Sequence, residues 1–332
     1  MIRNKTAYRI LCEEREHENA IPVYIQMTLG GLGNILAIVL LLVSRHEHKF
    51  QSFYILFTGL VITDLINNAV CYPLILQRYI SHFTWCLSYE LCDFLSFLET
   101  FSHLASGMFI CVMTMDRYLY IQRPPSEMAV NSRLKYIGVL CALLCITVAI
   151  SILHVMGLGN SQLYYPGSWC FLDFTSKTLG NKVNALIYSV FGISIMIVTV
   201  IIGFKTVIMS CRNTEYQALL LDNNLVTGIY DTHVTKFLVI SMFTFVFLWG
   251  PLLIDIFLHA TNLTKGNNKK ELWFIRLMYL NSQINPWLYV ILRRESLRRI
   301  FLMMMQCRKL FSRNEEESRY EEVQSFASIE HE

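Results

Sequence analysis

Seven long apolar runs, separated by short polar stretches, organise the chain. Each run is 21 to 29 residues long. At about 1.5 Å per residue, even the shortest forms a helix of roughly 30 Å, the thickness of a bilayer's hydrocarbon core. The pattern predicts an all-α membrane protein, a seven-transmembrane helix bundle. The runs are Ile21–Val43, Phe53–Leu76, Leu91–Leu119, Tyr136–Met156, Val183–Met209, Phe237–His259 and Leu272–Leu292.

The last run carries polar groups at membrane depth. Arg276 lies near one end of it, and an Asn-Pro-x-x-Tyr sequence, Asn285 to Tyr289, lies near the other. An arginine at the bilayer centre costs about 2.5 to 3.5 kcal/mol on insertion scales. Arg276 is therefore expected to face a cavity or the bundle interior, and to meet an anionic group there.

Composition agrees with a membrane protein. Of 332 residues, 54% are apolar and 16% are charged, below the roughly 25% charged residues of soluble domains. The net charge of +3 is too small to suggest a nucleic-acid surface, so no nucleic-acid partner is expected. The expected partners are membrane lipid, a small-molecule ligand and a cytosolic protein.

Four segments are expected along the chain. Residues 1–20 form an extracellular N-terminal tail and 21–292 the transmembrane domain; 293–311 form a short amphipathic eighth helix on the membrane surface, and 312–332 a disordered cytoplasmic tail. Six Arg and Lys residues follow the last run closely, against four in the first 20 residues, which places the C-terminus in the cytosol. The chain is thus predicted to be a multi-pass plasma-membrane protein.

Two kinds of modification fit this orientation. Asn-x-Thr sequons at Asn4 and Asn262 fall on the predicted outer side, where glycosylation occurs. Cys307 lies in the amphipathic segment and is a candidate for palmitoylation, with a plain buried thiol as the alternative.

The cysteines do not indicate a metal site, because most of the ten lie singly inside the apolar runs, where Cys behaves as a small apolar residue. Cys92 opens the third run and Cys170 lies midway in the loop between the fourth and fifth runs. A disulfide between them would hold that loop over the mouth of the bundle. A second bridge, between Cys12 and Cys86, is an alternative to free thiols at these positions.

Five motifs occur in order and at matching depths in the runs. They are Gly33-Asn34, Leu60 to Asp64, Asp116-Arg117-Tyr118, Phe245 with Trp249-Gly250-Pro251, and Asn285 to Tyr289 with Pro286. Together they resemble the rhodopsin-like (class A) G-protein-coupled receptors. The resemblance implies a receptor rather than an enzyme, one that signals through a heterotrimeric G protein and can also bind arrestin.

The same resemblance implies roles for residues near the inner end. The arginine of the third span, here Arg117, is restrained in the inactive state and meets the G protein when the inner end opens. Asp116 suits such a latch, because charge-assisted hydrogen bonds can be exchanged between partners. Snorkelling of Arg117 to headgroups is the alternative. Trp249 and Pro251 fit a helix bend that acts as a pivot.

Several amide and carboxyl groups lie at membrane depth and cannot be left unpaired. We expect one water-linked polar network, with Asp64 as the partner of a sodium ion or a proton. A network that only holds the helices together is the alternative. The residues concerned are Asn34, Asp64, Asn281 and Asn285.

A narrower resemblance is to the prostanoid receptors of the prostaglandin E type. Residues 165–171 read Tyr-Pro-Gly-Ser-Trp-Cys-Phe, close to that branch's Tyr-Pro-Gly-Thr-Trp-Cys-Phe, and Arg276 stands ten residues before Pro286. The resemblance implies that Arg276, Tyr79 and Ser168 hold a prostaglandin carboxylate, since a guanidinium offers it two parallel donors. Trp169 and Thr100, in the matched segments, are included in the expected site.

Glu99 departs from the prostanoid pattern, which has Met at this depth. Three interpretations stay open. Glu99 forms an internal salt bridge with Arg276, or it is protonated or turned aside in a carboxylate site, or it binds an amine or zwitterion. His103 lies one turn deeper, and Tyr279 is a further partner for Glu99.

Two other functions remain as alternatives. One is an amine or peptide receptor centred on Glu99. The other is a transporter or channel in which Arg276 and Asp64 line a conduction path, although the sequence shows no internal repeat of the transporter kind. The last run has no Lys, which excludes a retinal Schiff base.

Overall fold

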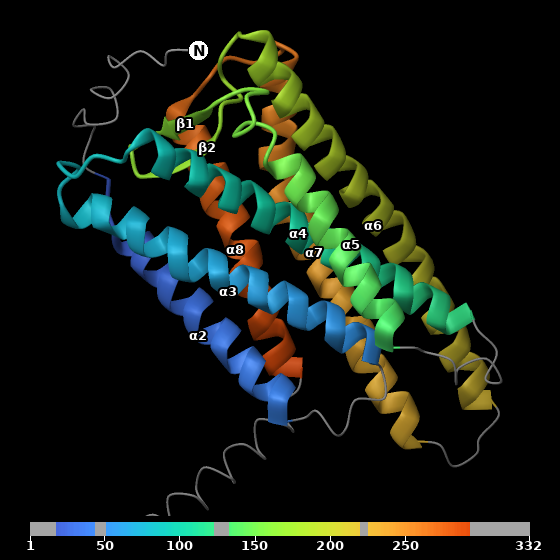
Figure 1. Ribbon diagram of the computed structural model, residues 1–332. Coiled ribbons are helices and arrows are strands. Elements are labelled where there is room, and N and C mark those ends of the chain that lie inside the picture. The colour runs from blue at the N-terminus through green and yellow to red at the C-terminus, as the bar shows by residue number, and fades with distance from the viewer. Residues whose placement is uncertain (1–17, 44–50, 123–132, 220–224, 293–332) are drawn as a thin grey trace, which may run out of the picture.

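The computed structural model describes residues 18–43, 51–122, 133–219 and 225–292. These ranges contain seven helices, which lie side by side as an elongated bundle, and a two-stranded sheet at one end of it, called here the hairpin end (Figure 1). The elements are α2 (Ile21–Val43), α3 (Gln51–Ile80), α4 (Tyr89–Gln122), α5 (Arg133–Ser151), β1 (Ser161–Tyr164), β2 (Trp169–Leu172), α6 (Leu179–Leu219), α7 (Leu225–Ala260) and α8 (Asn268–Leu292).

Several predicted features lie outside the described residues. They are Asn4, Cys12, Cys307 and the segments 293–311 and 312–332. The predictions made for them stay predictions. Asn262, the other predicted glycosylation site, is exposed in the turn after α7, at the hairpin end.

The apolar runs locate all seven described helices. Six of these helices, α2 to α7, are long and apolar enough to cross a membrane. The seventh, α8, is not among them, because polar residues such as Arg276, Asn281 and Asn285 interrupt its apolar sequence. The central helix is α4, most of whose side chains are buried and which contacts α3, α5, α6, α7, α8 and both strands.

Some helix ends differ from the prediction. The bounds of α2 are those predicted, whereas α6 and α7 continue beyond their apolar runs at the end opposite the hairpin. A helix needs apolar residues only where lipid or protein covers it, so an apolar run marks the buried part of a helix and not its ends.

The fourth helix is shorter than predicted. It ends at Ser151 instead of Met156, and the chain continues in turns to Gly157, which has a φ of 102°. The amide of Leu158 there donates to the carbonyl of Leu153 at 2.9 Å. This is the bonding pattern of a glycine-terminated helix end, which hydrophobicity alone does not reveal.

The sheet is a hairpin that lies across the mouth of the bundle. Strand β1 pairs antiparallel with β2, with Ser161 opposite Leu172 and Tyr164 opposite Trp169. The tight turn between them contains Gly167 at a φ of 96°, a conformation that glycine adopts without a steric penalty. All four residues of β2 are buried.

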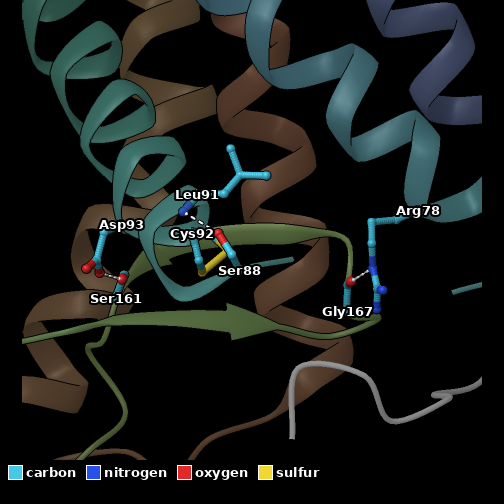
Figure 2. The surroundings of a disulfide bond; sticks show 8 residues. Arg78, Ser88, Leu91, Cys92, Asp93, Ser161 and Gly167 are labelled. Carbon is cyan, nitrogen blue, oxygen red and sulfur yellow. Dashed lines mark hydrogen bonds between the residues drawn. A yellow bond between two sulfur atoms is a disulfide. The ribbon is translucent and has the colours of Figure 1, made fainter. Parts of the chain in front are cut away.

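Two connections hold the hairpin in place (Figure 2). A disulfide joins Cys170 in β2 to Cys92 at the start of α4, which confirms the predicted bridge. On the other side, the fully buried Arg78 donates from Nε to the carbonyl of Gly167 at 2.8 Å and from Nη1 to the carbonyls of Phe83 and Trp85. Arg78 is thus an internal anchor of the hairpin turn.

Cys86 is also disulfide-bonded. Cys12, the partner that the sequence suggests for it, lies outside the described residues.

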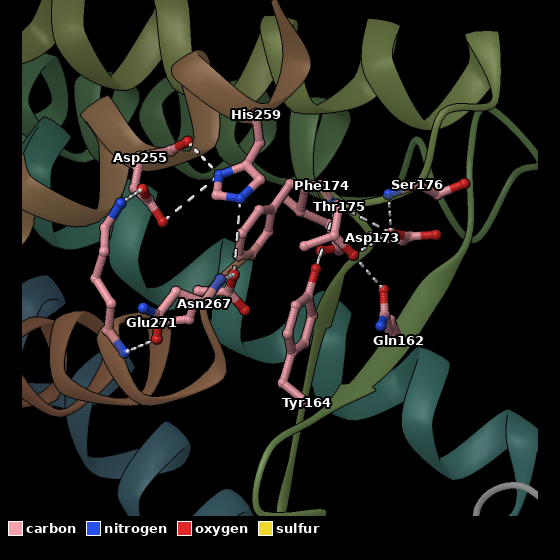
Figure 3. A network of polar contacts seen from close by, with 12 residues as sticks. Gln162, Tyr164, Asp173, Phe174, Thr175, Ser176, Asp255, His259, Asn267 and Glu271 are labelled. Atoms are coloured by element: carbon pink, nitrogen blue, oxygen red, sulfur yellow. Dashed lines mark hydrogen bonds and ion pairs between the residues drawn. The ribbon is translucent and has the colours of Figure 1, made fainter. Parts of the chain in front are cut away.

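The segment after β2 is held by one carboxylate (Figure 3). Asp173 accepts hydrogen bonds from the amides of Thr175 and Ser176, at 3.2 and 2.9 Å, and from the side chain of Asn181 at 2.5 Å. Burial raises the pKa of the Asp173 carboxyl, while these amide donors oppose the rise. The hairpin is thereby linked to the start of α6.

Close packing in the middle of the bundle depends on a glycine in α4. Phe245 and Trp249 of α7 are buried with ring centroids 5.0 Å apart, and a Cβ at Gly107 would lie 2.9 Å from the ring of Phe245. No larger residue fits between α4 and these rings without displacing them. Gly107 therefore sets how closely α4 and α7 approach.

We predict that Gly107→Ala lowers the free energy of unfolding by about 1–3 kcal/mol, the usual cost of overpacking. Gly138→Ala is the matched control, because a Cβ there meets nothing within 4 Å. It should leave stability equal or slightly raised, since alanine favours a helix. Thermal unfolding of the two purified variants in detergent measures the difference; equal melting temperatures would contradict this role of Gly107.

Candidate functional site

A cavity lies at the hairpin end between α2, α3, α8 and the hairpin turn. It encloses about 330 Å³ of space, including the part that opens to solvent. Five residues of the predicted site line it, although they are far apart in sequence: Tyr79, Ser168, Trp169, Arg276 and Tyr279. The other lining residues are Val23, Gln26, Tyr72, Ile75, Leu272 and Ile275.

The cavity is lined by both polar and apolar side chains. The hydroxyl of Ser168, in the hairpin turn, lies 3.5 Å from that of Tyr79 in α3. The guanidinium of Arg276 comes from α8, where the amide of Gln26 donates to the Arg276 carbonyl at 3.1 Å and ties α2 to this turn. The cavity thus combines a cation, two hydroxyl groups and an apolar wall.

Arg276 already contacts a carboxylate of its own chain. Its Nη2 lies 3.5 Å from Oε2 of Glu18, and the Tyr165 hydroxyl donates to Oε1 of Glu18 at 3.0 Å. At 3.5 Å this is an ion pair rather than a good hydrogen bond. The Arg276 Nη2 has no hydrogen-bond partner among the described residues, so it keeps a donor that a better-placed carboxylate can take.

Glu99 belongs to a second polar cluster, on α4. It is 2% exposed and accepts a hydrogen bond from the Tyr279 hydroxyl at 2.8 Å and a longer one from Asn67 at 3.4 Å. His103 lies beside it, with Nδ1 3.6 Å from the carboxylate. Among the described residues, Arg276 pairs with Glu18 and not with Glu99, so the Arg276–Glu99 salt bridge is not formed.

Three predicted ligand residues, Glu99, Thr100 and His103, lie outside the cavity. Thr100 donates to the backbone carbonyl of Ser96, and His103 contacts the carbonyl of Glu99. Tyr279 is the link between the two groups, because it lines the cavity and also binds Glu99.

The residues of the predicted polar network are buried in α2, α3 and α8, and the contacts between them stay a prediction. Asn34 is 1% exposed and donates to the carbonyl of Gly30 at 2.9 Å. Asp64 and Asn285 are also buried. Several oxygens in this group have no hydrogen-bond partner among the described residues: Asn34 Oδ1, Asp64 Oδ2, Asn281 Oδ1 and Asn285 Oδ1.

At the end opposite the hairpin, α4 is tied to three neighbouring helices. The Arg117 Nε donates to the hydroxyl of Thr235 in α7 at 3.1 Å. Asp116 accepts hydrogen bonds from Ser52 in α3 at 2.7 Å and from Tyr136 in α5 at 2.8 Å. Tyr118, the third residue of the motif, is half-buried.

The other predicted motif residues lie on α7 and α8. Pro251 and Pro286 are inside these helices, which continue through them. The Tyr289 ring packs on Phe57 of α3 with centroids 4.4 Å apart.

Sequence reasoning missed two residues near the cation. Glu18 falls in what was expected to be a plain polar tail, and Gln26 looks like one polar residue in an apolar run. The only signal for Glu18 was the general need of Arg276 for an anion. Its identity as the partner follows from the path of residues 18–20 into α2, which a pattern of hydrophobicity does not give.

Comparison with known proteins supplies the family. The family model described as "7 transmembrane receptor (rhodopsin family)" matches residues 33–289. The crystal structure of squid rhodopsin has the same fold, with a TM-score of 0.72 at 17% sequence identity over 91% of this chain and 87% of that chain.

Several prostanoid receptors are similar in sequence. The prostaglandin E2 receptor EP4 subtype from Bos taurus is 33% identical over 178 residues, 53% of this chain and 36% of that receptor. This match thus spans about a third of the EP4 relative's length. The EP3 subtype from Bos taurus is 28% identical over 85% of this chain and 74% of its own, and the Homo sapiens thromboxane A2 receptor is 26% identical over 82% of each.

The family model begins at Gly33 in α2 and ends at Tyr289 in α8, so it includes residues of all seven described helices. Because that family consists of receptors, an enzymatic function is not assigned to the bundle. The chain belongs to the rhodopsin family of seven-transmembrane receptors.

Proposed function

We propose that the protein is a plasma-membrane receptor for a prostanoid or a related lipid carboxylate and that it signals through heterotrimeric G proteins, with arrestin as a further partner. The hairpin end faces the outside and the Arg117 end faces the cytosol. The observation that carries the proposal is the Arg276 guanidinium, which lies beside a carboxylate in a cavity shared with Tyr79 and Ser168. The similarity to the EP4, EP3 and thromboxane A2 receptors supports the ligand class.

The cavity chemistry suits a fatty-acid derivative. A carboxylate that forms two parallel hydrogen bonds with Arg276 replaces the longer contact with Glu18. The hydroxyls of Tyr79 and Ser168 offer further single donors in the same cavity. Apolar lining residues such as Ile75, Leu272 and Ile275 then cover part of the hydrocarbon chain.

The size of the cavity bears on how the ligand enters. Its volume of about 330 Å³ includes space that is open to solvent, so the enclosed part is smaller than ligand pockets, which range from roughly 300 to 1,000 Å³. A prostanoid therefore widens it, and the segment that carries Glu18 moves aside. An agonist acts by binding the widened, active arrangement better than the resting one.

The contact between Arg117 and Thr235 restrains the resting state. It joins α4 to α7 at the cytoplasmic end, where the G protein would insert. Separation of these helices frees Arg117 for the G protein. The packed rings of Phe245 and Trp249, together with Pro251, make the middle of α7 the pivot of this movement.

A sodium ion fits the polar network near Asp64. The unpartnered oxygens there belong to one carboxyl and three amide groups, the kind of donor that a hard cation prefers. A bound cation supplies positive charge next to Asp64, and Asn34, Asn281 and Asn285 would complete its oxygen ligands.

Removal of the cation tests the ligand class. Arg276→Ala should weaken prostaglandin E2 binding by about 10- to 100-fold, because hydrogen bonds to a charged group contribute roughly 1.5–3 kcal/mol. The affinity of Arg276→Lys for prostaglandin E2 should fall between those of Arg276→Ala and the parent, because lysine keeps the charge but loses the paired donors. The measurement is radioligand displacement at matched surface expression. Unchanged affinity in Arg276→Ala would rule out the proposed anchor.

Removal of the internal carboxylate tests competition at the same site. Glu18→Gln should tighten prostaglandin E2 binding about two- to fivefold, since a partly exposed ion pair contributes about 0.5–1 kcal/mol. Glu90→Gln removes the same charge from an exposed position at the start of α4 and serves as the control. The gain should vanish in an Arg276→Ala background. A weaker affinity in Glu18→Gln alone would mean that Glu18 helps binding instead.

Release of the restraint at Arg117 tests coupling. Thr235→Val removes the hydroxyl that Arg117 bonds and should raise ligand-independent nucleotide exchange on the G protein severalfold, up to about tenfold. Thr206→Val is the control, because that hydroxyl bonds only to a carbonyl of its own helix. Arg117→Ala should abolish exchange. A transporter or channel would show no nucleotide exchange in any of these forms.

A further inference from the structure

We propose that Asp255, His259 and Glu271 form a binding site for a divalent transition-metal ion, with Zn²⁺ as the best fit. The site lies at the hairpin end, between α7 and the first turn of α8 (Figure 3). It does not include any residue that lines the Arg276 cavity. Apart from a sodium ion near Asp64, no metal site was expected from the sequence, and these three residues were not singled out.

Three potential ligand atoms converge from two helices. Asp255 and His259 are four residues apart in α7 and so share one helical face. One ligand atom from each of the three side chains lies within 4.8 Å of the others. The exposed fractions of Asp255, His259 and Glu271 are 2%, 8% and 3%, so water does not fully solvate these charges.

The orientation of His259 leaves one ring nitrogen available. Its Nδ1 lies 2.8 Å from the backbone carbonyl of Asp255, and a carbonyl can only accept, so Nδ1 carries the proton. The lone pair of the neutral ring is then on Nε2, which is the atom that metals bind. In Figure 3 this nitrogen points toward Glu271.

The unpartnered atoms of the cluster point to a cation. His259 Nε2 has no hydrogen-bond partner among the described residues, and its nearest ionic neighbour is Oε1 of Glu271 at 3.7 Å. A lone pair on Nε2 and a carboxylate oxygen repel each other unless a proton or a metal ion lies between them. Oδ2 of Asp255 also lacks a hydrogen bond among the described residues. A metal ion would satisfy His259 Nε2 and Asp255 Oδ2 together, and Glu271 Oε1, which accepts a hydrogen bond from the amide of Asn267 at 2.9 Å, keeps a second lone pair for it.

The donor set selects the metal. One imidazole nitrogen and two carboxylate oxygens, with water in the fourth position, are a common zinc arrangement, whereas Mg²⁺ and Ca²⁺ prefer oxygen alone. Bonds of about 2.0–2.1 Å in tetrahedral geometry place ligand atoms roughly 3.3 Å apart. The 3.7 Å between His259 Nε2 and Glu271 Oε1 is close to that spacing. Rotation of the Asp255 carboxylate brings in the third ligand.

Lys270 competes with the metal. Its ammonium lies 2.5 Å from Oδ1 of Asp255 and offsets part of the negative charge in the metal-free cluster. The Lys270 side chain is 37% exposed, so it can turn into solvent when a divalent ion enters. The ring of Phe174, edge-on to His259 at 5.5 Å, covers the other side and links the site to the segment after the hairpin.

Zinc titration of the purified full chain in detergent, followed by calorimetry and by thermal unfolding, tests the site. Zinc should bind saturably and raise the melting temperature in proportion to its occupancy, and Mg²⁺ at the same concentration should not. His259→Gln and Glu271→Gln should each weaken zinc binding at least tenfold. Neither measurement depends on the ligand or the G protein, so the result stands apart from the proposed receptor function.

Lys270→Met separates a metal site from a structural ion cluster. Loss of the competing ammonium should tighten zinc binding roughly fivefold, while Lys269→Met, which removes the neighbouring exposed charge, should not change it. A purely structural cluster would lose stability in Lys270→Met and gain no zinc affinity. Absence of saturable zinc binding in both the parent and Lys270→Met, or equal binding after His259→Gln and Glu271→Gln, overturns the proposal.

Discussion

A guanidinium inside a helix bundle needs an anion, and this requirement organises the hairpin end of the molecule. Arg276 meets it with Glu18, through an ion pair that leaves Nη2 without a hydrogen bond to any residue in the described part of the chain. The charge of Arg276 is therefore neutralised, but not all of its hydrogen-bond donors are used. A carboxylate-binding site needs the same two properties. Its positive charge is compensated well enough to be stable, and its hydrogen-bond donors stay available for a better-placed acceptor.

The hairpin makes this arrangement possible because it is fixed from both sides. The disulfide between Cys92 and Cys170 holds β2 to α4, and Arg78 holds the turn that carries Ser168. Arg78 is itself a fully buried cation, and backbone carbonyls accept from its Nε and Nη1, while its Nη2 has no hydrogen-bond partner among the described residues. The two arginines differ in what lies around them. Arg78 bonds loop carbonyls of the fold, whereas Arg276 lines the cavity and pairs with a carboxylate.

Contacts on α4 connect the two ends of the bundle. Tyr279 lines the cavity and bonds Glu99 on α4, Gly107 sets the approach of α4 to Phe245, and Arg117 bonds Thr235. Each contact has a partner on α7 or α8 that would have to shift if those helices moved. In the proposed mechanism, a widened cavity is therefore coupled to separation of α4 from α7 at the Arg117 end. The bond between Arg117 and Thr235 is the one that the proposed G protein would break.

Local pattern determined much of this structure, and tertiary contacts determined the rest. The seven helices could be predicted because membrane burial demands about twenty apolar residues in a row, and the bounds of α2 followed to the residue. The Cys92–Cys170 bridge followed from the positions of two cysteines relative to the runs. The burial of Arg78 and the pairing of Arg276 with Glu18 did not follow, because they depend on where loops return.

Helix ends outside the membrane were also poorly predicted. Capping and turn residues such as Gly157 govern them, and hydrophobicity carries no signal for that. The same limit applies to the cluster around His259, whose three ligand candidates come from two helices and form no recognisable motif.

The carboxylate itself offers the most direct measurement. Prostaglandin E2 and its C1 alcohol analogue differ only in the group that Arg276 is proposed to bind, so their displacement constants on the unmodified receptor isolate that contact. The anchoring role of Arg276 predicts that the alcohol binds roughly 10- to 100-fold more weakly. Equal affinities for the acid and the alcohol would show that the guanidinium does not hold the ligand.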